Sequence, residues 1–350
     1  MTPLQKLLEL IVAPSGPAGR EAQRRLDQFT KPPGSLGRLE EMARRLCEIT
    51  GACPPPLRHP VIFTLAADHG VAAEGVSAYP QVVTAQMVEN LLRGGAAVNV
   101  LARHVGARVV IADLGVAVPL APDPGLVSRP IAPGTRRMTS GPAMTRAEAV
   151  RAIEVGIELV ERERARLDLI GTGEMGIGNT TAASAITAAL TGAPVEEVTG
   201  RGTGIDPAAV ARKAQAVQRA IDVNRPDPSD GLDVLGKLGG FEIAGLVGVI
   251  LAGAAFRIPV IVDGFIATAA ALAAVTIKPE TRCSLLAAHR STEPGHERAL
   301  AALGLDPYLD LRMRLGEGTG AALCIGLAQA AVKILTEMAT FKSAGVSDRL

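Results

Sequence analysis

Residues 167–181 read LDLIGTGEMGIGNTT, and this stretch decides the fold. A short apolar run at 167–170 ends at a glycine-rich turn, and an alanine-rich helical pattern follows. Short buried strands that alternate with helices are typical of a parallel sheet covered on both faces. The same succession recurs along the chain, so we predict an α/β fold. The other apolar runs lie at 61–66, 109–112, 260–262 and 285–288.

Polar or glycine-rich segments follow these predicted strands directly. They read DHG at 68–70, DLG at 113–115, DG at 263–264 and HRS at 289–291. In parallel sheets the loops at the carboxyl ends of the strands collect the ligand-binding residues. We therefore expect the functional site at this edge of the sheet.

Both ends of the chain have a helical pattern and lack a strand pattern. We predict a small helical subdomain built from residues 1–50 and 320–350, which caps a large α/β catalytic domain at 55–319. Stretches rich in proline and glycine at 117–143 and 224–231 are predicted loops. The first is long enough to be functional.

Charge and composition exclude several classes of partner. The 350 residues carry 36 basic and 35 acidic side chains, a net charge of +1, and aromatic residues make up 2%. A balanced charge gives no electrostatic attraction for nucleic acid or an anionic membrane, and base stacking needs more aromatic rings. We expect small-molecule substrates, with neither nucleic acid nor membrane as a partner.

The four cysteines form no CxxC pair, which argues against a disulfide framework or a structural zinc site and favours a reduced compartment. The amino-terminal segment lacks the pattern of a signal peptide. The most apolar stretch, 243–262, contains Arg257 and Pro259 and divides into a predicted helix at 243–256 and a strand at 259–263. We therefore predict a cytoplasmic protein.

The strongest chemical signal is GTGEMGIGNTT at 171–181. Glycines allow close approach of the backbone, and a helix amino terminus presented in this way favours an anionic ligand. The alternative is a tight strand-to-helix turn that needs glycine for steric reasons. Glu174 favours ligand binding, because a carboxylate among glycines has no obvious packing role.

A second glycine-rich loop, TGRGTGID at 199–206, precedes a helix that carries Arg212 and Lys213. This pattern indicates a phosphate site with a cationic partner, and the alternative is a flexible loop with a solvated lysine. Two such loops in one α/β sheet favour a ligand of nucleotide size that carries a phosphate.

A third motif, LGEGTGA at 315–321, opens a long apolar helix. Glu317 at a helix start can simply complement the helix dipole. In an apolar pocket its pKa would instead be raised, and the carboxylate could serve as a general base.

Two further polar segments remain, ADHGVAAEGVSAYPQ at 67–81 and AHRSTEPGH at 288–296. An Asp68-His69 pair invites a metal or acid–base role, but a lone pair of this kind is more often structural, and we predict no metal. Tyr79, one of two tyrosines, is a candidate for contact with a flat aromatic ligand. Ser291 and its neighbours could complete a phosphate site, and His289 and His296 are either ligands or satisfied polar residues.

Missing motifs also bear on function. No pair of adjacent acidic residues follows a strand in the way that holds a magnesium-bound diphosphate donor, and there is no GxSxG or HExxH motif. Hydrolases and enzymes that use a diphosphate ribose donor are therefore disfavoured. Two alternatives remain open: another nucleotide-using transferase or kinase, and a binding module that has lost the chemistry.

With these residues in view, the chain resembles the nicotinate-nucleotide:5,6-dimethylbenzimidazole phosphoribosyltransferase family over nearly its whole length. Eight motifs carry the resemblance, in order. They are KPPGSLGRLE at 31–40, ADHG at 67–70, GEMGIGNTT at 173–181, GRGTG at 200–204, GGFEIA at 239–244, VDGF at 262–265, HRS at 289–291 and GEGTG at 316–320.

The resemblance implies a Rossmann-like parallel sheet with a small helical domain from both termini, in a homodimer. It implies transfer of the 5-phosphoribosyl group from nicotinate mononucleotide to 5,6-dimethylbenzimidazole in cobalamin assembly, with no cofactor. Glu317 corresponds to the family's catalytic base, and Glu174 to the second acidic residue near the reacting centre.

The resemblance also assigns the substrate contacts. Some relatives accept adenine, phenols or other benzimidazoles, so the acceptor stays open between these bases, and residues 79–87 would decide it. The implied acceptor contacts are Tyr79, Gln86 and Leu315. The implied mononucleotide contacts are Gly176, Gly178, Asn179, Thr180, Gly202, Lys213, Asp263 and Ser291.

Overall fold

The structure, a computed structural model, describes residues 2–347. Its centre is a six-stranded sheet in which every neighbouring pair is parallel, in the order β3-β2-β1-β4-β5-β6. The order reverses between β1 and β4, which is where doubly wound sheets open a ligand crevice. The α/β prediction is confirmed. The strands are β1 (Pro60–Ala67), β2 (Arg108–Gly115), β3 (Leu126–Ser128), β4 (Leu169–Met175), β5 (Val260–Val262) and β6 (Leu285–Ala287).

Two strands differ from the prediction. β4 begins two residues later than expected and continues through the glycine-rich segment to Met175, because β1 pairs with it over that whole length. β3 was missed, since it is only three residues long and lies inside the predicted loop at 117–143, pairing with β2 at the sheet edge.

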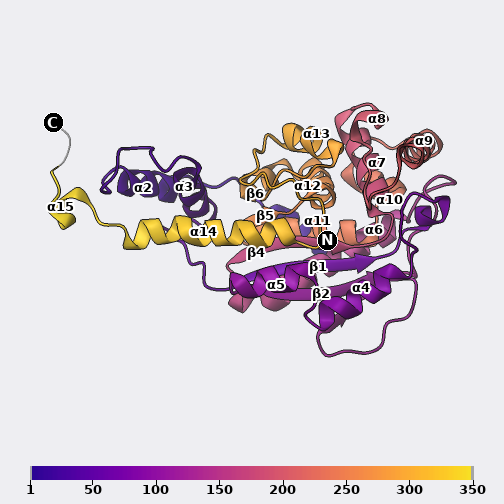
Figure 1. Cartoon of the computed structure of the whole chain (residues 1–350), viewed down its shortest axis with the longest axis horizontal. Coiled ribbons are helices and arrows are strands. Elements are labelled where there is room, and N and C mark those ends of the chain that lie inside the picture. Colours follow the sequence, from indigo (N-terminus) through magenta and orange to yellow (C-terminus); the bar gives the residue numbers. More distant parts are fainter. Residues whose placement is uncertain (1, 348–350) are drawn as a thin grey trace.

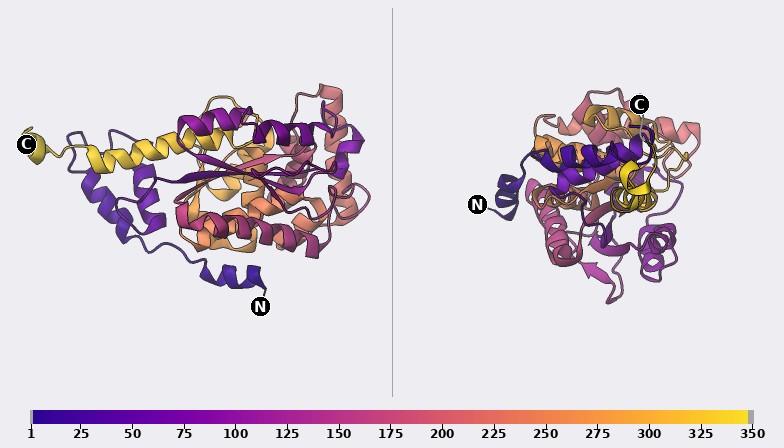
Figure 2. Two further views of the ribbon diagram at one scale, coloured as in Figure 1. Left: turned by 90° about the horizontal axis from the view of Figure 1, so that it is seen from below. Right: turned by 90° about the vertical axis from the view of Figure 1, so that its left-hand side faces the viewer.

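Helices cover both faces of the sheet, as Figure 2 shows. Alternate side chains of β1 point to opposite faces: Phe63 and Leu65 join one hydrophobic core, and Ile62 and Ala66 join the other. One face is covered by α6 (Arg146–Glu163), α10 (Gly231–Leu238) and α11 (Phe241–Ala255), and the other by α4 (Val83–Leu92), α5 (Ala97–His104) and α14 (Thr319–Glu337).

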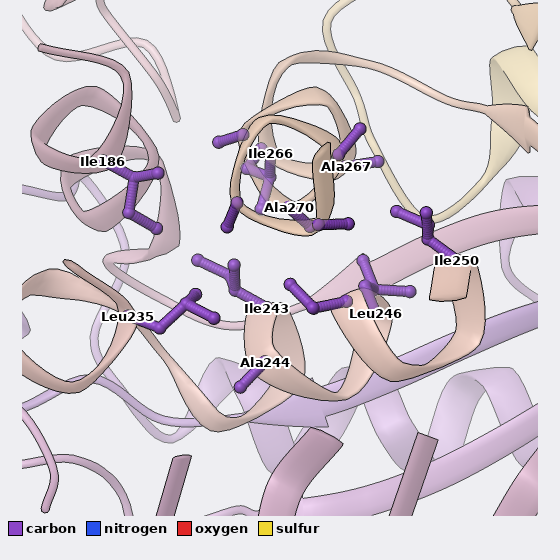
Figure 3. Packing of buried hydrophobic residues seen from close by; sticks show 14 of the residues in the cluster. Ile186, Leu235, Ile243, Ala244, Leu246, Ile250, Ile266, Ala267 and Ala270 are labelled. Atoms are coloured by element: carbon purple, nitrogen blue, oxygen red, sulfur yellow. The ribbon is translucent and has the colours of Figure 1, made fainter. Parts of the chain in front are cut away.

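Helix α11 is buried along almost its entire length because it has neighbours on several sides. It contacts β1 and α6, and α12 (Phe265–Ile277) packs on it from outside. Figure 3 shows Ile243, Leu246 and Ile250 of α11 opposite Ile266 and Ala270 of α12. Four further helices pack around α12 and one another. They are α7 (Asn179–Thr191), α8 (Val195–Val198), α9 (Pro207–Asn224) and α13 (Pro294–Leu303).

The chain ends are helical, as predicted, but they pack in two places. Helix α1 (Pro3–Leu10) lies on α6 and α11, whereas α2 (Pro17–Leu26) and α3 (Arg38–Thr50) pack against α14. Figure 1 shows α2 and α3 beside the far half of α14, beyond the sheet, with α15 (Phe341–Ala344) at the tip. The division into two domains at residues 50 and 320 stays a prediction.

Helix α14 is the one helix in residues 2–347 that is long and apolar enough to cross a bilayer by length and composition. Half of this apolar window is buried in the protein, where it contacts β4, α5 and α3. The apolar stretch at 243–262 forms α11 and β5 instead, in agreement with its predicted division into a helix and a strand.

Candidate active site

A cavity of about 790 Å³ opens at the carboxyl ends of the strands. Segments that follow β1, β4, β5 and β6 line it, together with the loop before α14. The structure therefore brings the predicted polar segments together at this edge of the sheet. The predicted site residues in the lining are Tyr79, Glu174, Gly176, Asn179, Thr180, Gly202, Ser291, Leu315 and Glu317, and four others, Gly178, Lys213, Asp263 and Gln86, are not in it.

The loop that carries Glu317 has an unusual backbone. Gly316, Glu317 and Gly318 have φ angles of +82°, +62° and +99°. A non-glycine residue in this region costs on the order of 1–3 kcal/mol and persists where its surroundings impose it. Here the surroundings are the sheet: the Thr64 hydroxyl donates a 3.0 Å hydrogen bond to the Glu317 carbonyl. A Cβ on Gly173 would lie 2.2 Å from that same oxygen, so only glycine allows this approach.

Asp263 fixes the same loop from behind. Its Oδ1 accepts a 2.8 Å hydrogen bond from the Ala321 amide, and its Oδ2 accepts one of 3.3 Å from the Gly318 amide. It therefore caps the amino terminus of α14, where a carboxylate complements the free amides. The predicted contact of Asp263 with a mononucleotide remains untested, and the contacts seen are those of a residue that positions Glu317.

The Glu317 carboxyl group is buried but incompletely bonded. Burial raises its pKa, the negative charge of Asp263 adds to the rise, and the Val98 amide at the start of α5 opposes it. Its Oε2 has no hydrogen-bond partner among the described residues. A buried carboxyl group with a raised pKa and a free oxygen is suited to accept a proton from a ligand.

Glu174 lies beside this loop at the end of β4. A Cβ on Gly316 would come within 2.2 Å of its Oε1, and its Oε2 accepts a hydrogen bond from the Asn179 side chain. Burial raises the pKa of Glu174 to about 8; the charges of Asp263, Glu242 and Glu317 also raise it, and the Asn179 hydrogen bond opposes the rise. At neutral pH this carboxyl group is therefore largely protonated.

The turn between β4 and α7 presents backbone groups to the cavity. Helix α7 begins at Asn179 after Gly178, whose φ is +99°. Gly176, Asn179 and Thr180 line the cavity, whereas a Cβ on Gly178 would point toward His69 and Ala72. The turn therefore points one side to the ligand space and rests the other on the segment after β1.

A buried hydrogen bond between a histidine and a glutamate lies under this turn. The His69 Nε2 is 2.6 Å from the Glu242 Oε1, and both side chains are almost fully buried. Asp68 accepts a 2.8 Å hydrogen bond from the Ala117 amide. Asp68 and His69 thus support the turn from below. Sequence reasoning missed Glu242, the partner of His69, although the GGFEIA motif contains it. Among residues 2–347, no group of three or more His, Cys, Asp or Glu side chains is arranged to hold a metal ion.

The loop at 200–204 contacts the buried Lys213 from α9. Its Nζ donates hydrogen bonds to the Thr180 hydroxyl at 2.8 Å and to the Gly200 carbonyl at 3.3 Å. Burial lowers the pKa of Lys213 to about 8, and the charge of Glu293 opposes this. Lys213 is fully buried and lies directly behind Gly202, since a Cβ on Gly202 would be 3.0 Å from Nζ.

The side chain of His296 fixes the segment that follows β6 by hydrogen bonds. The Ser291 amide donates a 2.9 Å hydrogen bond to His296 Nδ1, and His296 Nε2 lies 2.9 Å from the Thr268 hydroxyl. Burial lowers the pKa of His296 to about 3, so the ring is neutral and structural. Arg290 forms ion pairs with acidic side chains outside the cavity. Within this segment His289, Ser291 and Glu293 line the cavity, and the candidate His289 is almost fully buried there.

The outer wall of the cavity is apolar. Tyr79 and Leu315 are more than half exposed, at 55% and 57%, and Val83 and Met87 of α4 lie in the same lining. Gln86 is exposed and outside it. Further apolar members are Ala97, Leu101, Met175, Ile177, Phe265, Ile266 and Met313.

Two charged lining residues had not been predicted as site residues. The Arg314 guanidinium donates a 2.7 Å hydrogen bond to the Gly202 carbonyl, and the Glu293 carboxylate accepts one of 2.9 Å from the Gly202 amide. Thr203 also joins this loop to the segment of Tyr79, because its hydroxyl accepts a 2.9 Å hydrogen bond from the Ala78 amide. The position of Glu293 in the segment after β6 was the available sequence signal.

Comparison with known proteins bears on this site. The model of a family described as phosphoribosyltransferase matches residues 11–346. The curated nicotinate-nucleotide–dimethylbenzimidazole phosphoribosyltransferase of Geobacter sulfurreducens is 55% identical over 349 residues, which is 99% of each chain. The protein of the same name from Chloroflexus aggregans is 58% identical and covers 95% of this chain and 94% of its own.

Solved structures agree with these relatives. A crystal structure of the nicotinate-nucleotide–dimethylbenzimidazole phosphoribosyltransferase of Thermus thermophilus has a TM-score of 0.89 at 48% identity, and covers 95% of this chain and 99% of that one. A second crystal structure from the same organism, titled CobT, has a TM-score of 0.91 at 49% identity with the same coverage.

Proposed function

The chain belongs to the nicotinate-nucleotide–dimethylbenzimidazole phosphoribosyltransferase family, and on this premise we propose that it transfers 5-phosphoribose from nicotinate mononucleotide to 5,6-dimethylbenzimidazole. The products are α-ribazole 5′-phosphate and nicotinate, in the assembly of the lower ligand of cobalamin. The observation that carries the proposal is a pair of buried carboxyl groups with different surroundings in one cavity, beside a glycine loop backed by a buried lysine.

Glu317 is the general base in this proposal. Its free Oε2 takes the N–H proton of the benzimidazole while the other ring nitrogen attacks the anomeric carbon. A carbon–nitrogen bond forms as the bond to nicotinate breaks on the opposite face, and the bonding electron pair leaves with the nicotinate nitrogen. A positioned base contributes on the order of 10²–10⁴-fold to the rate.

Glu174 has a different task. With its pKa raised to about 8, it is protonated at neutral pH and can donate a hydrogen bond to a ligand. Its neutral state also leaves Glu317 as the carboxylate that carries charge at the reacting centre, which limits repulsion between the two groups. Glu174 therefore supports the base without competing for the proton.

Binding of the mononucleotide uses the glycine turns. We assign ribose and nicotinate to the turn of Gly176, Gly178, Asn179 and Thr180. The phosphate is assigned to Gly202, Lys213 and Ser291, where amides, an ammonium and a hydroxyl suit an anion.

The acceptor ring is assigned to the apolar outer wall, against Tyr79 and Leu315. Gln86 reaches it only if its exposed side chain turns inward. Holding both substrates in line supplies roughly 7–11 kcal/mol in well-oriented reactions, which exceeds the contribution of the base.

The chemistry requires no metal in this proposal, because nicotinate is a good leaving group and the donor has no diphosphate to neutralise. We further propose that the protein acts in the cytoplasm as a homodimer, and that residues 1–50 and 320–350 form a subdomain apart from the catalytic residues 55–319. Light scattering tests the dimer, and limited proteolysis followed by mass spectrometry tests the domain boundary.

A product assay tests the function. The purified chain is incubated with nicotinate mononucleotide and 5,6-dimethylbenzimidazole in EDTA without magnesium, and products are separated by chromatography. We expect α-ribazole 5′-phosphate and nicotinate in equal amounts. Turnover with adenine or a phenol alone would move the acceptor and keep the mechanism. Absence of turnover with every acceptor would leave a binding module.

A further inference from the structure

Glu293 accepts a hydrogen bond from the Gly202 amide, a donor that the proposed function assigns to the substrate phosphate. It precedes α13 and is 5% exposed. Its Oε1 accepts a 2.9 Å hydrogen bond from the Gly202 amide. In the proposed function that amide belongs to the phosphate of the mononucleotide, and one N–H cannot serve two anions at full strength. A phosphate and this carboxylate therefore require the same group.

The second oxygen of the Glu293 carboxylate lacks a hydrogen-bond donor among the described residues. This oxygen, Oε2, is buried. A Cβ on Gly200 would lie 2.2 Å from this oxygen, so the carboxylate rests directly against the backbone of the glycine loop. A buried charged oxygen without a donor is unfavourable. Glu293 is therefore not held in place by a complete set of bonds.

Lys213 lies against the same loop and is also incompletely compensated, although the charge of Glu293 acts on it. Its ammonium is fully buried, and its hydrogen bonds go to a hydroxyl and a carbonyl. No ion pair of Lys213 occurs within residues 2–347. A buried cation without a paired anion is costly, and an arriving phosphate would remove that cost. The site therefore contains a buried ammonium group, Lys213, that is suited to bind a phosphate. It also contains an amide, that of Gly202, which already donates its hydrogen bond to the Glu293 carboxylate.

We propose that Glu293 is an internal substitute for the substrate phosphate: in the free protein its carboxylate holds the Gly202 amide, and the phosphate displaces it from that amide on binding. This rests on the proposed function. The substitute keeps the loop at 200–204 in its binding conformation while the site is empty. It also weakens the affinity for the donor, because like charges must approach one another when the phosphate enters.

The test removes the charge and keeps the shape. Glu293→Gln retains an oxygen that can accept from the Gly202 amide, so the loop is preserved. Binding of nicotinate mononucleotide and of inorganic phosphate is measured by calorimetry at low salt. We expect both ligands to bind on the order of tenfold more tightly than to the unchanged protein, because one like charge is gone. Unchanged or weaker binding of phosphate would overturn the proposal.

Controls separate this result from other causes. Glu297→Gln removes an equal charge from the first turn of α13, where the side chain is 79% exposed, and we expect affinities within about twofold of the unchanged protein. Lys213→Met is expected to lose phosphate binding. If Glu293 instead bound the ribose, Glu293→Gln would weaken the mononucleotide and leave phosphate unaffected, which also contradicts the proposal.

A failure of the proposed function gives a different pattern. The unchanged protein would then bind inorganic phosphate yet fail to turn over nicotinate mononucleotide, and the phosphate comparison between Glu293→Gln and Glu297→Gln would still be readable. Circular dichroism and thermal unfolding of each variant establish that the fold is intact before affinities are compared.

Discussion

Two turns of this protein begin with the same two residues and end in different chemistry. The turn at 173–179 and the turn at 316–319 both start Gly-Glu, and each leads into a helix after a glycine with a φ of +99°. Glu174 still lies in the extended backbone of β4, whereas Glu317 has a φ of +62° in a loop pressed on the sheet.

The surroundings of the two carboxyl groups then separate them. Burial, together with the charges of three other acidic groups, raises the pKa of Glu174 to about 8, although the Asn179 hydrogen bond opposes the rise, so Glu174 is protonated at neutral pH. Glu317 faces the Val98 amide and keeps one oxygen free. The neighbours of a Gly-Glu motif therefore decide which carboxyl group can take up a proton.

The largest effect is expected for Glu317→Gln, which removes the proton acceptor itself. Turnover should fall by roughly 10²–10⁴-fold, the range for a positioned base. Affinity for nicotinate mononucleotide in calorimetry should change little, because the amide keeps the shape of the carboxyl group. A comparable loss of donor affinity would count against the base role.

Gly173→Ala should disrupt the close approach of the Glu317 loop to β4, which gives Glu317 its unusual backbone conformation. Its Cβ would lie 2.2 Å from the Glu317 carbonyl, so the loop must move. We expect a loss of about 1–3 kcal/mol in the free energy of unfolding and a fall of about tenfold to a hundredfold in turnover, as for misplaced catalytic groups. Denaturant titration and the product assay measure these.

Gly236→Ala is the matched control for that substitution. The nearest atom to its added Cβ is 3.6 Å away, an ordinary contact, and the residue lies inside α10. Both measurements should stay near those of the unchanged protein. If Gly236→Ala and Gly173→Ala had equal effects, the close approach at residue 173 would not be the cause.

Glu174→Gln tests the protonated state of the second carboxyl group. At pH 7 the loss of turnover should be less than about tenfold, because a neutral amide resembles the neutral acid. In the unchanged protein turnover should fall as pH rises through about 8, where Glu174 loses its proton. The variant should lack this fall. A pH profile of turnover that is identical in both proteins would show that Glu174 does not titrate in this range.

The smallest effect is expected from substituting the neighbours of Glu174. These substitutions should shift the pH at which turnover falls, and the two neighbours should shift it in opposite directions. The Asn179 hydrogen bond lowers the pKa of Glu174, so Asn179→Ala should move the alkaline fall in turnover to higher pH. The Glu242 charge raises that pKa, so Glu242→Gln should move the fall to lower pH while an amide oxygen can still bond to His69. Shifts of both variants in one direction would contradict this electrostatic account.

Much of the fold could be predicted from the sequence because buried parallel strands are short apolar runs with polar segments after them. The edge strand at Leu126–Ser128 could not, since three residues in a proline-rich stretch have no pattern of their own. β4 was predicted too short because Gly171 and Gly173 suggest a turn, whereas β1 provides the pairing that keeps them extended.

For the site, the sequence predicted which turns meet but not which side chains face the cavity. His69 and Glu242 are 173 positions apart, and Gly202 and Glu293 are 91 apart, so only the folded sheet brings each pair together. Gln86 was placed by the resemblance alone, and the phase of α4 leaves it outside the lining, where Val83 and Met87 lie instead.

Helix α14 gives the protein a mechanical property. Its first residue follows the Glu317 loop by one glycine, and its far half packs on α3 and α2. A 19-residue helix without proline is a stiff rod of roughly 28 Å. The Glu317 loop and the helices α2 and α3 therefore lie at opposite ends of one stiff helix. A small rotation of α2 and α3 would tilt the Glu317 loop, so the orientation of its carboxyl group also depends on packing outside the cavity.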